Sequence, residues 1–407
     1  MDATTPESFG KRLQRLRMRQ GMTREVLGGL VGRTGQWIKE VETGRLQMPK
    51  LHVLIQLAEV LRLDLAELTG SPETVLRGFS GGPGHPALPA VRDAINEVPW
   101  GTDNTPPEPV TVLQARLDAA WRARHAAPDH RTVLGALLPS LIRDTRRTVR
   151  AYATGDDARW ARAIMAGVWN LTQFFAAYQP DAALLWRVAE RGMTVAMESD
   201  DPHAIGGAVW LLAQAHRDQG EFEAAESVNL HALEYLEPRV ADAGDQTAAM
   251  YGALLFEAGY TAARAGQRGT AWHYWDRAAR IADRLEPGWY DPMTSFSRVV
   301  MGAHAVTIAV EAQQKAEGLK QARRNAALAI PSNPRRGRHL IEVARAFDRA
   351  NEPEATLGTL QGAYQTAPET IRYNGYAREI VGRMAGSGPA GLRREASDLA
   401  ERIGIVA

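Results

Sequence analysis

Three closely spaced helix breaks mark the N-terminal part of the chain. Residues 21–44 read GMTREVLGGLVGRTGQWIKEVETG. Thr23 and Thr34 each follow a break that contains glycine, and threonine is a preferred cap for a helix N-terminus. Gly44 follows the last apolar position, where helices commonly end. The stretch therefore predicts two very short helices that are joined by a tight turn.

The same helical spacing continues on both sides of this stretch. Apolar side chains recur every three or four positions, at Phe9, Leu13, Leu16, Leu54, Leu57 and Leu61. Short segments with this period bury one face against each other. Residues 8–69 are therefore predicted to form one compact unit of five short helices.

Charge is unevenly distributed along the chain. The first 50 residues contain ten Lys or Arg against five Asp or Glu, a net charge of +5, whereas the whole chain of 407 residues carries +1. The rest of the chain is therefore slightly acidic. A local basic excess is the electrostatic pattern of a domain that docks on phosphate groups. We therefore expect the N-terminal unit to bind nucleic acid.

This unit resembles the lambda-repressor/Cro-like helix-turn-helix family, also called the xenobiotic-response-element family. The residues that carry the resemblance are Leu13, Arg17, Gly21, Met22, Thr23, Leu27, Gly32, Thr34, Ile38, Glu42, Gly44, Pro49, Leu54, Leu57, Ala58, Leu61 and Leu68. The resemblance implies that Thr34 starts a recognition helix for the DNA major groove, anchored by Ile38 and Val41. Three residues depart from the family pattern: Gly28, Arg33 and Gly35.

The resemblance also implies which residues contact DNA. Base contacts fall on Gln36, Trp37, Lys39 and Glu40, and phosphate contacts fall on Arg24, Thr34, Arg45 and Lys50. Gln36 is the leading base reader, because its amide makes the paired hydrogen bonds that adenine presents. Two alternatives stay open: Trp37 packs at the helix N-terminus instead of contacting a base, and Glu40 is solvated or paired with an arginine. Arg17 and Glu42 match an ion pair that ties the first helix to the third.

Composition changes abruptly after residue 70. Eight prolines lie between residues 71 and 110, together with a Gly-Gly-Pro-Gly run at 81–84. This composition predicts a linker, in which residues 91–98 have the spacing for a helical turn or two. From residue 111 to 407 the chain is rich in Ala, Leu and Arg at helical spacing. We therefore predict an all-α chain, with a helix-turn-helix domain at 1–70, a linker at 71–110 and a helical domain at 111–407.

The predicted helical domain has an internal period. Small residues near the start of a predicted helix recur at intervals of 43, 46, 45 and 39 residues: Ala182, Ala225, Ala271, Ala316 and Ala355. Small side chains let antiparallel helices approach closely, as they do in solenoids. Residues 155–385 resemble tetratricopeptide repeats, with a period longer than the standard one of about 34. The clearest instance runs from Trp210 through Gly220, Ala225 and Ala232 to Pro238. The resemblance implies a tetratricopeptide-like α-solenoid that dimerises and receives a signal.

Two functions from different classes remain open. The domain order resembles that of Gram-positive peptide-sensing regulators, as in quorum sensing, and of actinobacterial regulators. That resemblance implies a homodimeric repressor or activator that binds an inverted repeat in double-stranded DNA, under the control of a peptide or small-molecule effector. The alternative is an interaction scaffold whose repeats bind a protein partner, with DNA binding secondary.

Four polar residues interrupt apolar helices of the predicted repeats: Asn170, Gln173, Gln214 and Arg217. A polar side chain in such a position needs a partner. They either form hydrogen bonds from helix to helix or line a groove that binds an effector. A basic cluster, Arg335, Arg336 and Arg338, is predicted in a loop between repeats, where it is solvated or contacts DNA or an acidic partner.

The sequence carries no pattern typical of catalysis. It has no cysteine, and it contains no His-Glu-x-x-His, phosphate loop or nucleophile elbow. We therefore expect no enzymatic activity, cofactor or metal site. The chain has no long apolar run and does not begin with an apolar signal core. These features predict a cytoplasmic protein without a membrane partner.

Overall fold

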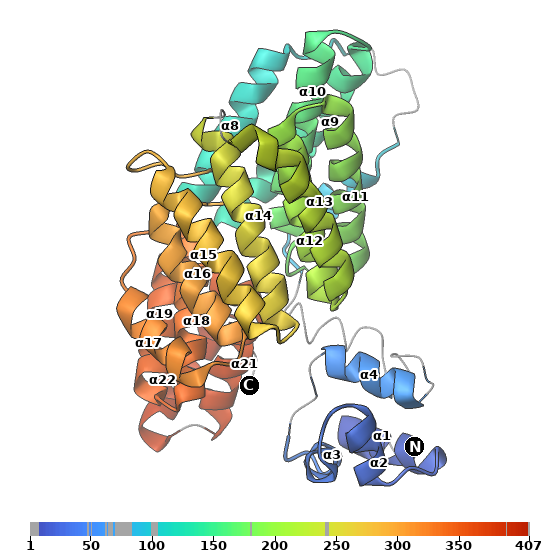
Figure 1. Cartoon of the computed structure of the whole chain (residues 1–407), viewed down its shortest axis with the longest axis vertical. Helices are drawn as coiled ribbons and strands as arrows, with labels where there is room; N and C mark the ends of the chain where they lie inside the picture. The colour runs from blue at the N-terminus through green and yellow to red at the C-terminus, as the bar shows by residue number, and fades with distance from the viewer. Residues whose placement is uncertain are drawn as a thin grey trace. The chain divides into compact units, whose positions relative to one another are not determined.

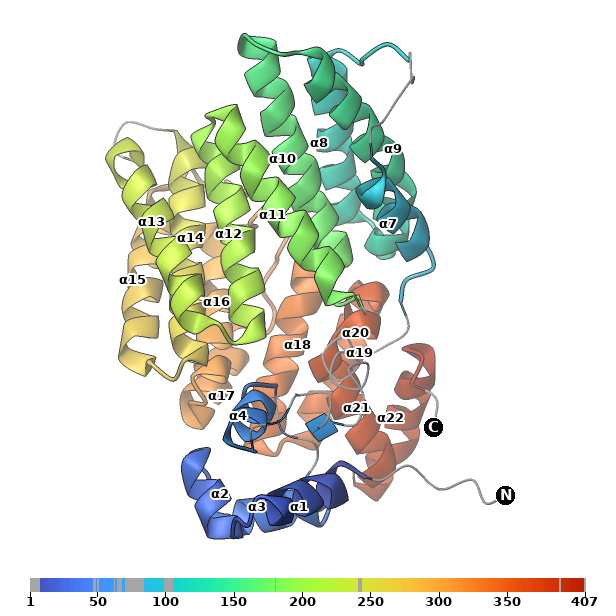
Figure 2. The ribbon, with the colours of Figure 1, turned by 90° about the vertical axis from the view of Figure 1, so that its right-hand side faces the viewer.

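The computed structural model describes residues 8–46, 49, 51–61, 63, 68–69, 84–98, 105–179, 181–240, 244–387 and 389–405. Every regular element in these ranges is a helix (Figures 1 and 2), which confirms the predicted all-α class. The chain divides into two compact units, residues 1–79 and 80–407. Over the described ranges, the helices are too short or too polar to cross a membrane.

The N-terminal unit begins with short, capped helices. Its described helices are α1 (Phe9–Arg19), α2 (Arg24–Leu30), α3 (Gly35–Glu42) and α4 (Leu51–Leu61). Thr23 caps α2, because its Oγ1 accepts a hydrogen bond of 3.2 Å from the Val26 backbone N–H. Thr34 caps α3 in the same way, through a bond of 3.1 Å from the Trp37 N–H. The two predicted caps therefore set where both helices start.

These helices enclose a small apolar core. Its buried side chains come from all four helices and include Leu13, Leu16, Leu27, Ile38, Leu54, Leu57 and Leu61. The predicted fifth helix falls on a stretch of which Leu63, Leu68 and Thr69 are described, the last two in helical conformation. The rest of that helix lies outside the described residues. Leu68 is fully buried in the same core.

Two glycines allow the short helices to approach closely. A Cβ atom on Gly10 of α1 would lie 2.5 Å from the backbone oxygens of Val41 and Glu42 at the end of α3. A Cβ atom on Gly28 of α2 would lie 2.8 Å from the carbonyl carbon of Thr34. The departure from the family pattern at Gly28 therefore accompanies a close contact between α2 and the turn before α3.

Gly10→Ala is expected to destabilise the N-terminal unit by about 1–3 kcal/mol, the usual effect of overpacking a tight contact. The backbone oxygens that face Gly10 cannot rotate away as a flexible side chain would. Amide hydrogen exchange of α1–α3 in the whole chain measures the effect. Gly29→Ala is the control, because nothing lies within 4 Å of its added Cβ and alanine favours a helix. Equal exchange in the two variants would contradict the packing of α1 on α3.

The second unit is built from consecutive helices. They are α7 (Leu88–Asn96), α8 (Val110–Ala126), α9 (His130–Ala151), α10 (Asp156–Ala176), α11 (Ala182–Ser199), α12 (Pro202–Gln219), α13 (Phe222–Val240), α14 (Asp245–Arg264), α15 (Arg268–Arg284), α16 (Arg298–Glu311), α17 (Lys315–Asn325), α18 (Asn333–Ala350), α19 (Pro353–Thr366), α20 (Pro368–Tyr373), α21 (Gly375–Ser387) and α22 (Ala390–Arg402). Most of them pack against the next helix along the chain (Figure 2).

The paired helices follow the period that the sequence predicts. The five periodic alanines lie within the first four residues of α11, α13, α15, α17 and α19, the second helix of each pair. Ala225 and Ala271 are fully buried. A Cβ atom on Gly259 of α14 would lie 3.0 Å from the Ala271 carbonyl oxygen of α15, so small residues on both helices permit this contact. The tetratricopeptide-like arrangement is confirmed.

Part of the predicted linker folds with the second unit. Helix α7 lies within residues 71–110, and its Leu88, Val91 and Ile95 are buried in the core of that unit. Arg146 of α9 donates a hydrogen bond of 2.7 Å to the Ala94 carbonyl of α7. Residues 71–83 and 99–104 lie outside the described residues. The boundaries at residues 70 and 110 remain predictions.

Candidate functional site

Helix α3 has one apolar and one polar face. Ile38 and Val41 are buried in the core of the N-terminal unit. Gln36 and Lys39 lie on the other side of the helix and are exposed. This amphipathic arrangement follows from the helical period of 3.6 residues. Helix α3 is therefore fixed by one face and presents the other face to solvent.

Three of the predicted base readers, Gln36, Trp37 and Glu40, make contacts within the domain. Gln36 donates a hydrogen bond of 3.0 Å from Nε2 to Glu40 Oε1, one turn along the helix. Trp37 is half-buried and packs against the core, with the Arg33 guanidinium 5.6 Å from the centre of its ring. These contacts favour the structural alternative for Trp37. They leave the side chains of Gln36 and Glu40 at the surface, held by each other.

A buried carboxylate joins the first three helices. Arg17 Nε of α1 lies 2.6 Å from Glu42 Oε1 of α3, and Arg24 Nε of α2 lies 2.7 Å from Glu42 Oε2. The Glu42 side chain is only 1% exposed. Arg17 Nη1 also donates to the Met22 carbonyl at 2.5 Å. The predicted partners Arg17 and Glu42 are thus brought together, and Arg24 joins them.

The predicted phosphate contacts surround the start and end of α3. Thr34 caps the helix N-terminus, where unpaired backbone N–H groups and the helix dipole favour an anion. Arg45 is exposed just after the helix. Arg24 is engaged through Nε but its side chain stays 31% exposed. Lys50 lies outside the described residues.

Three of the four predicted effector residues have partners in other parts of the same unit. Asn170 is buried, and its Nδ2 lies 3.1 Å from Met293 Sδ. Gln173 donates a hydrogen bond of 2.9 Å to the Leu211 carbonyl of α12. Gln214 is half-buried on α12. For Gln173 the structure favours the helix-to-helix alternative, whereas Asn170 bonds a residue of the segment between α15 and α16.

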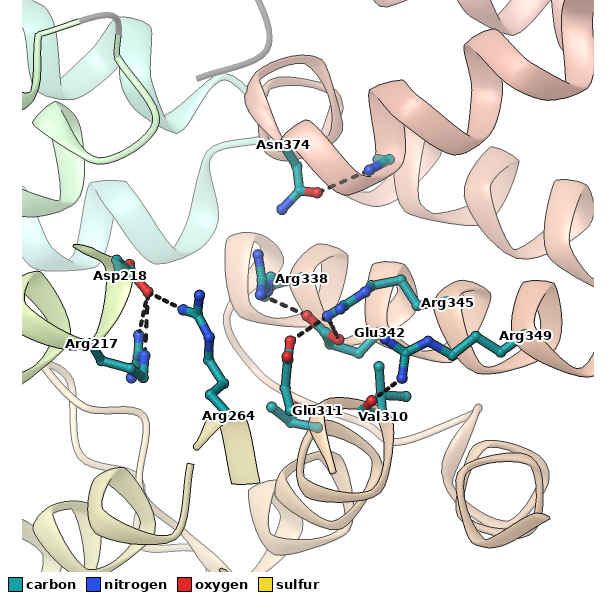
Figure 3. Close-up of polar contacts among 12 residues, drawn as sticks. Arg217, Asp218, Arg264, Val310, Glu311, Arg338, Glu342, Arg345, Arg349 and Asn374 are labelled. Atoms are coloured by element: carbon teal, nitrogen blue, oxygen red, sulfur yellow. Dashed lines mark hydrogen bonds and ion pairs between the residues drawn. The ribbon is translucent and has the colours of Figure 1, made fainter. Parts of the chain in front are cut away.

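Charged side chains link the first helices of successive pairs (Figure 3). Arg217 of α12, the fourth predicted effector residue, forms an ion pair with Glu257 of α14. Arg345 of α18 lies 2.7 Å from Glu311 Oε1 of α16 and 2.6 Å from Glu342 Oε2. All five side chains are buried. Burial opposes the charge of Arg345, but Glu311 and Glu342 outweigh it and raise the pKa of Arg345.

The basic cluster does not lie in a loop. Arg335, Arg336 and Arg338 belong to the first two turns of α18, so the loop prediction is wrong. The cause is an early helix start, because Ser332 caps α18 through a bond to the Arg335 N–H and Pro334 favours a first turn. Arg338 then lies 2.6 Å from Glu342 Oε1 within the helix. Figure 3 shows this pair beside Arg345.

The N-terminal residues match a known family. Residues 8–69 match a family model described as a helix-turn-helix domain. The predicted domain is therefore confirmed, and the chain combines a helix-turn-helix domain with a unit of paired helices. In the described part of the chain, no three His, Asp or Glu side chains are grouped as they would be to hold a metal ion. No curated protein sequence matched the chain.

Three solved structures are similar over much of their length. BtubC (BKLC) from P. vanneervenii has 11% identity, covering 63% of this chain and 91% of that one, with a TM-score of 0.39. Bacillus thuringiensis PlcR in complex with the peptide PapR7 and DNA has 9% identity, covering 90% and 95%, with a TM-score of 0.29. The apo competence regulator ComR from Streptococcus vestibularis has 14% identity, covering 74% and 98%, with a TM-score of 0.26. These scores are too low to carry a functional argument.

Proposed function

We propose that this protein is a sequence-specific DNA-binding transcriptional regulator. The observation that carries the proposal is the outer face of α3, where Gln36 and Lys39 are exposed on a helix whose other face is anchored in the core. A helix held in this way enters the major groove and reads base edges. The match of residues 8–69 to a helix-turn-helix domain and the basic excess of the first 50 residues support it.

The predicted contact residues have separate roles in this proposal. Gln36 reads a base, and the flanking Lys39 and Glu40 contact the groove. Thr34, Arg45 and Lys50 hold phosphates, which fix orientation but carry no sequence information. Arg24 contributes through its terminal nitrogens, because its Nε is held by Glu42.

The proposed regulator acts as a homodimer on an inverted repeat in bacterial DNA, in the cytoplasm. Two helix-turn-helix domains read half-sites about 34 Å apart or a multiple of it. The second unit, residues 80–407 and called the repeat unit below, sets the separation of the two domains. It binds a peptide or small-molecule effector, whose affinity differs between two conformations of the repeat unit. Of the four predicted effector residues, Gln214 is half-buried on α12, so its side chain keeps surface that an effector can contact.

Gln36→Ala is expected to weaken specific DNA binding by about 1–3 kcal/mol and to relax the preference at one base pair, because a bidentate contact to a base is lost. The preferred site is first selected by full-length protein from a random duplex library. Titration of that site then measures both variants. Gln56→Ala is the matched control, since Gln56 is an exposed glutamine of α4 and not of the proposed recognition helix α3.

The same selection decides between the two functions. Enrichment of an inverted repeat supports the regulator, and loss of that preference in Gln36→Ala assigns the reading role. Binding that is salt-sensitive but enriches no sequence would contradict the proposal. It would favour the scaffold, whose repeats bind a protein partner while the helix-turn-helix domain only tethers it to DNA.

A further inference from the structure

The two ends of the repeat unit are joined by polar contacts. At the end of α8, His125 Nδ1 lies 2.8 Å from Ser332 Oγ, the cap of α18. At the start of α9, the Arg131 backbone N–H donates a hydrogen bond of 2.5 Å to Glu369 Oε2 of α20. These partners are 207 and 238 residues apart in the sequence. The succession of helix pairs therefore closes, with α8 and α9 against α18 and α20.

Three arginines gather at this closure. Arg124 lies near the end of α8, Arg131 lies at the start of α9, and Arg335 lies in the first turn of α18. Arg124 and Arg131 both contact Phe174, because the Arg124 guanidinium lies 4.2 Å from the centre of its ring and Arg131 Nη1 donates a hydrogen bond of 3.2 Å to its carbonyl. Arg124 Nη1 also lies 3.4 Å from His125 Nδ1, which contacts Ser332, three residues before Arg335. Burial, and then the charges of Arg131 and Arg335, lower the pKa of Arg124 to about 10.

The three guanidinium groups lack a counter-ion. No carboxylate of the described residues lies within ion-pair distance of any of them. The Nε atoms of Arg124 and Arg131 are buried and have no acceptor in that part of the chain. Arg131 Nη1 donates to the Phe174 and Phe175 carbonyls, which carry no net charge. Burying unpaired cations in this way is unfavourable, especially side by side.

The carboxylates nearest to the closure already have other partners. Glu342 pairs with Arg338 and Arg345. Glu369 accepts from the backbone at the start of α9, and its Oε1 accepts from the Thr132 hydroxyl. Burial and the Arg131 charge keep the pKa of His130 well below its usual value, so His130 adds no charge near neutral pH. Burial lowers the pKa values of Arg131 and Arg335, and the nearby charges of Glu369 and Glu342 offset this effect only in part. The closure therefore keeps a positive excess among the described residues.

The site is partly open to solvent. Arg124 and Arg131 are only 8% and 5% exposed, whereas Arg335 is half-buried. Aromatic rings line the inner side, with the Arg124 guanidinium 4.2 Å from the centre of the Phe174 ring. The Tyr290 hydroxyl is also buried, and the centre of the Tyr290 ring lies 6.0 Å from that of His125 at the end of α8. Arg335 is therefore the most accessible of the three arginines at the closure.

We propose that Arg124, Arg131 and Arg335 bind the carboxylate or phosphate group of a small molecule at the closure of the repeat unit. A guanidinium group matches both oxyanions, because it donates two parallel N–H···O bonds. The bound group would neutralise the excess charge and connect α8 and α9 to α18. This inference rests on the proposed function in one respect, because it names the chemistry of the effector.

Calorimetric titration of the full-length protein with inorganic phosphate tests the site, and citrate serves as the carboxylate probe. We expect saturable binding of one anion per chain with a Kd on the order of millimolar or below. We also expect a rise in Tm over a chloride buffer of equal ionic strength, because the anion binds the native state. Tighter binding of phosphate than of citrate points to a phosphate-bearing effector, and the reverse points to a carboxylate. Equal Tm in all three salts, without measurable binding heat, overturns the site.

Arg335→Gln separates a binding role from a structural one. Because the charge of Arg335 adds to the burial that lowers the pKa of Arg124 in the free protein, the Tm of this variant in chloride should equal or exceed that of the wild type. Its affinity for the better probe should fall at least tenfold. Arg324→Gln is the matched control, since Arg324 is an exposed arginine of α17. A Tm rise in phosphate that does not saturate and persists in Arg335→Gln is general salt stabilisation and overturns the proposal.

These measurements do not involve DNA, so the two proposals fail separately. Anion binding without selection of a DNA sequence contradicts the regulator and retains the site. Selection of a DNA sequence without anion binding retains the regulator and removes this site from it. If both hold, the ratio of DNA affinities with and without the anion measures their coupling.

Discussion

Glu42→Ala is expected to destabilise the helix-turn-helix domain by about 3–5 kcal/mol, the usual result of removing one partner from a buried ion pair. Glu42 is 1% exposed and bonds both Arg17 and Arg24. Its removal leaves the Arg17 guanidinium, 9% exposed, without a counter-ion in the core. Many small domains have a total stability of about 5–15 kcal/mol. The variant domain should therefore be largely or partly unfolded.

Amide hydrogen exchange of α1–α3 in the whole chain measures this loss, and binding to the selected DNA site should fail with it. Glu59→Ala is the control, because Glu59 is an exposed carboxylate of α4 and such changes usually stay within about 0.5 kcal/mol. Similar exchange in the two variants would mean that Glu42 is solvated rather than buried between two arginines.

Acidification from pH 7 to about pH 4.5 is expected to destabilise the repeat unit by several kcal/mol. Burial lowers the pKa of His125 and of His339 to about 4, with the Arg124 charge adding to the effect on His125. Burial also holds the pKa values of His130 and His304 well below the usual range. In the unfolded chain these imidazoles titrate near 6.5. Between this pH and the lower pKa values of the native state, the unfolded state binds more protons than the native state.

The sign of the effect follows from this difference in bound protons. When the unfolded state binds more protons, stability falls as the pH falls, by up to about 1.4 kcal/mol per pH unit for each histidine. Above about pH 7 these histidines are neutral in both states, so they do not change the free energy of unfolding with pH. Denaturant unfolding at a series of pH values, followed by helical circular dichroism, measures the curve.

His304→Phe tests the assignment of this slope. The His304 ring is stacked on Phe256, with centroids 3.4 Å apart and ring planes at 3°, so a phenyl ring keeps the shape but cannot titrate. Between pH 6.5 and 4.5, the slope of the unfolding free energy against pH should decrease by the contribution of one histidine, up to about 1.4 kcal/mol per pH unit. His273→Gln, at an exposed position of α15, should leave it unchanged. An unchanged slope in His304→Phe would show that His304 does not resist protonation.

Local sequence was sufficient for the elements and for much of the proposed reading face. Thr23 and Thr34 cap α2 and α3 as predicted, because capping depends on residues three positions away. The periodic alanines Ala225 and Ala271 predicted the paired helices, since a helix that must approach a neighbour needs small residues at a fixed interval. The partner of Arg17 was implied by resemblance to a family, and not by the spacing of the two residues.

Burial and long-range pairing were decided by tertiary structure. The sequence placed Arg335 in a loop and gave Arg124 and Arg131 no role, yet α8, α9 and α18 bring the three together at the closure of the repeat unit. Composition and period describe each helix separately, whereas the surroundings of a charged side chain depend on helices some 200 residues away. The sequence by itself therefore determined the helices, their order and the helix-turn-helix domain. Only the tertiary structure decided which charges are paired, because that depends on how the ends of the repeat unit meet.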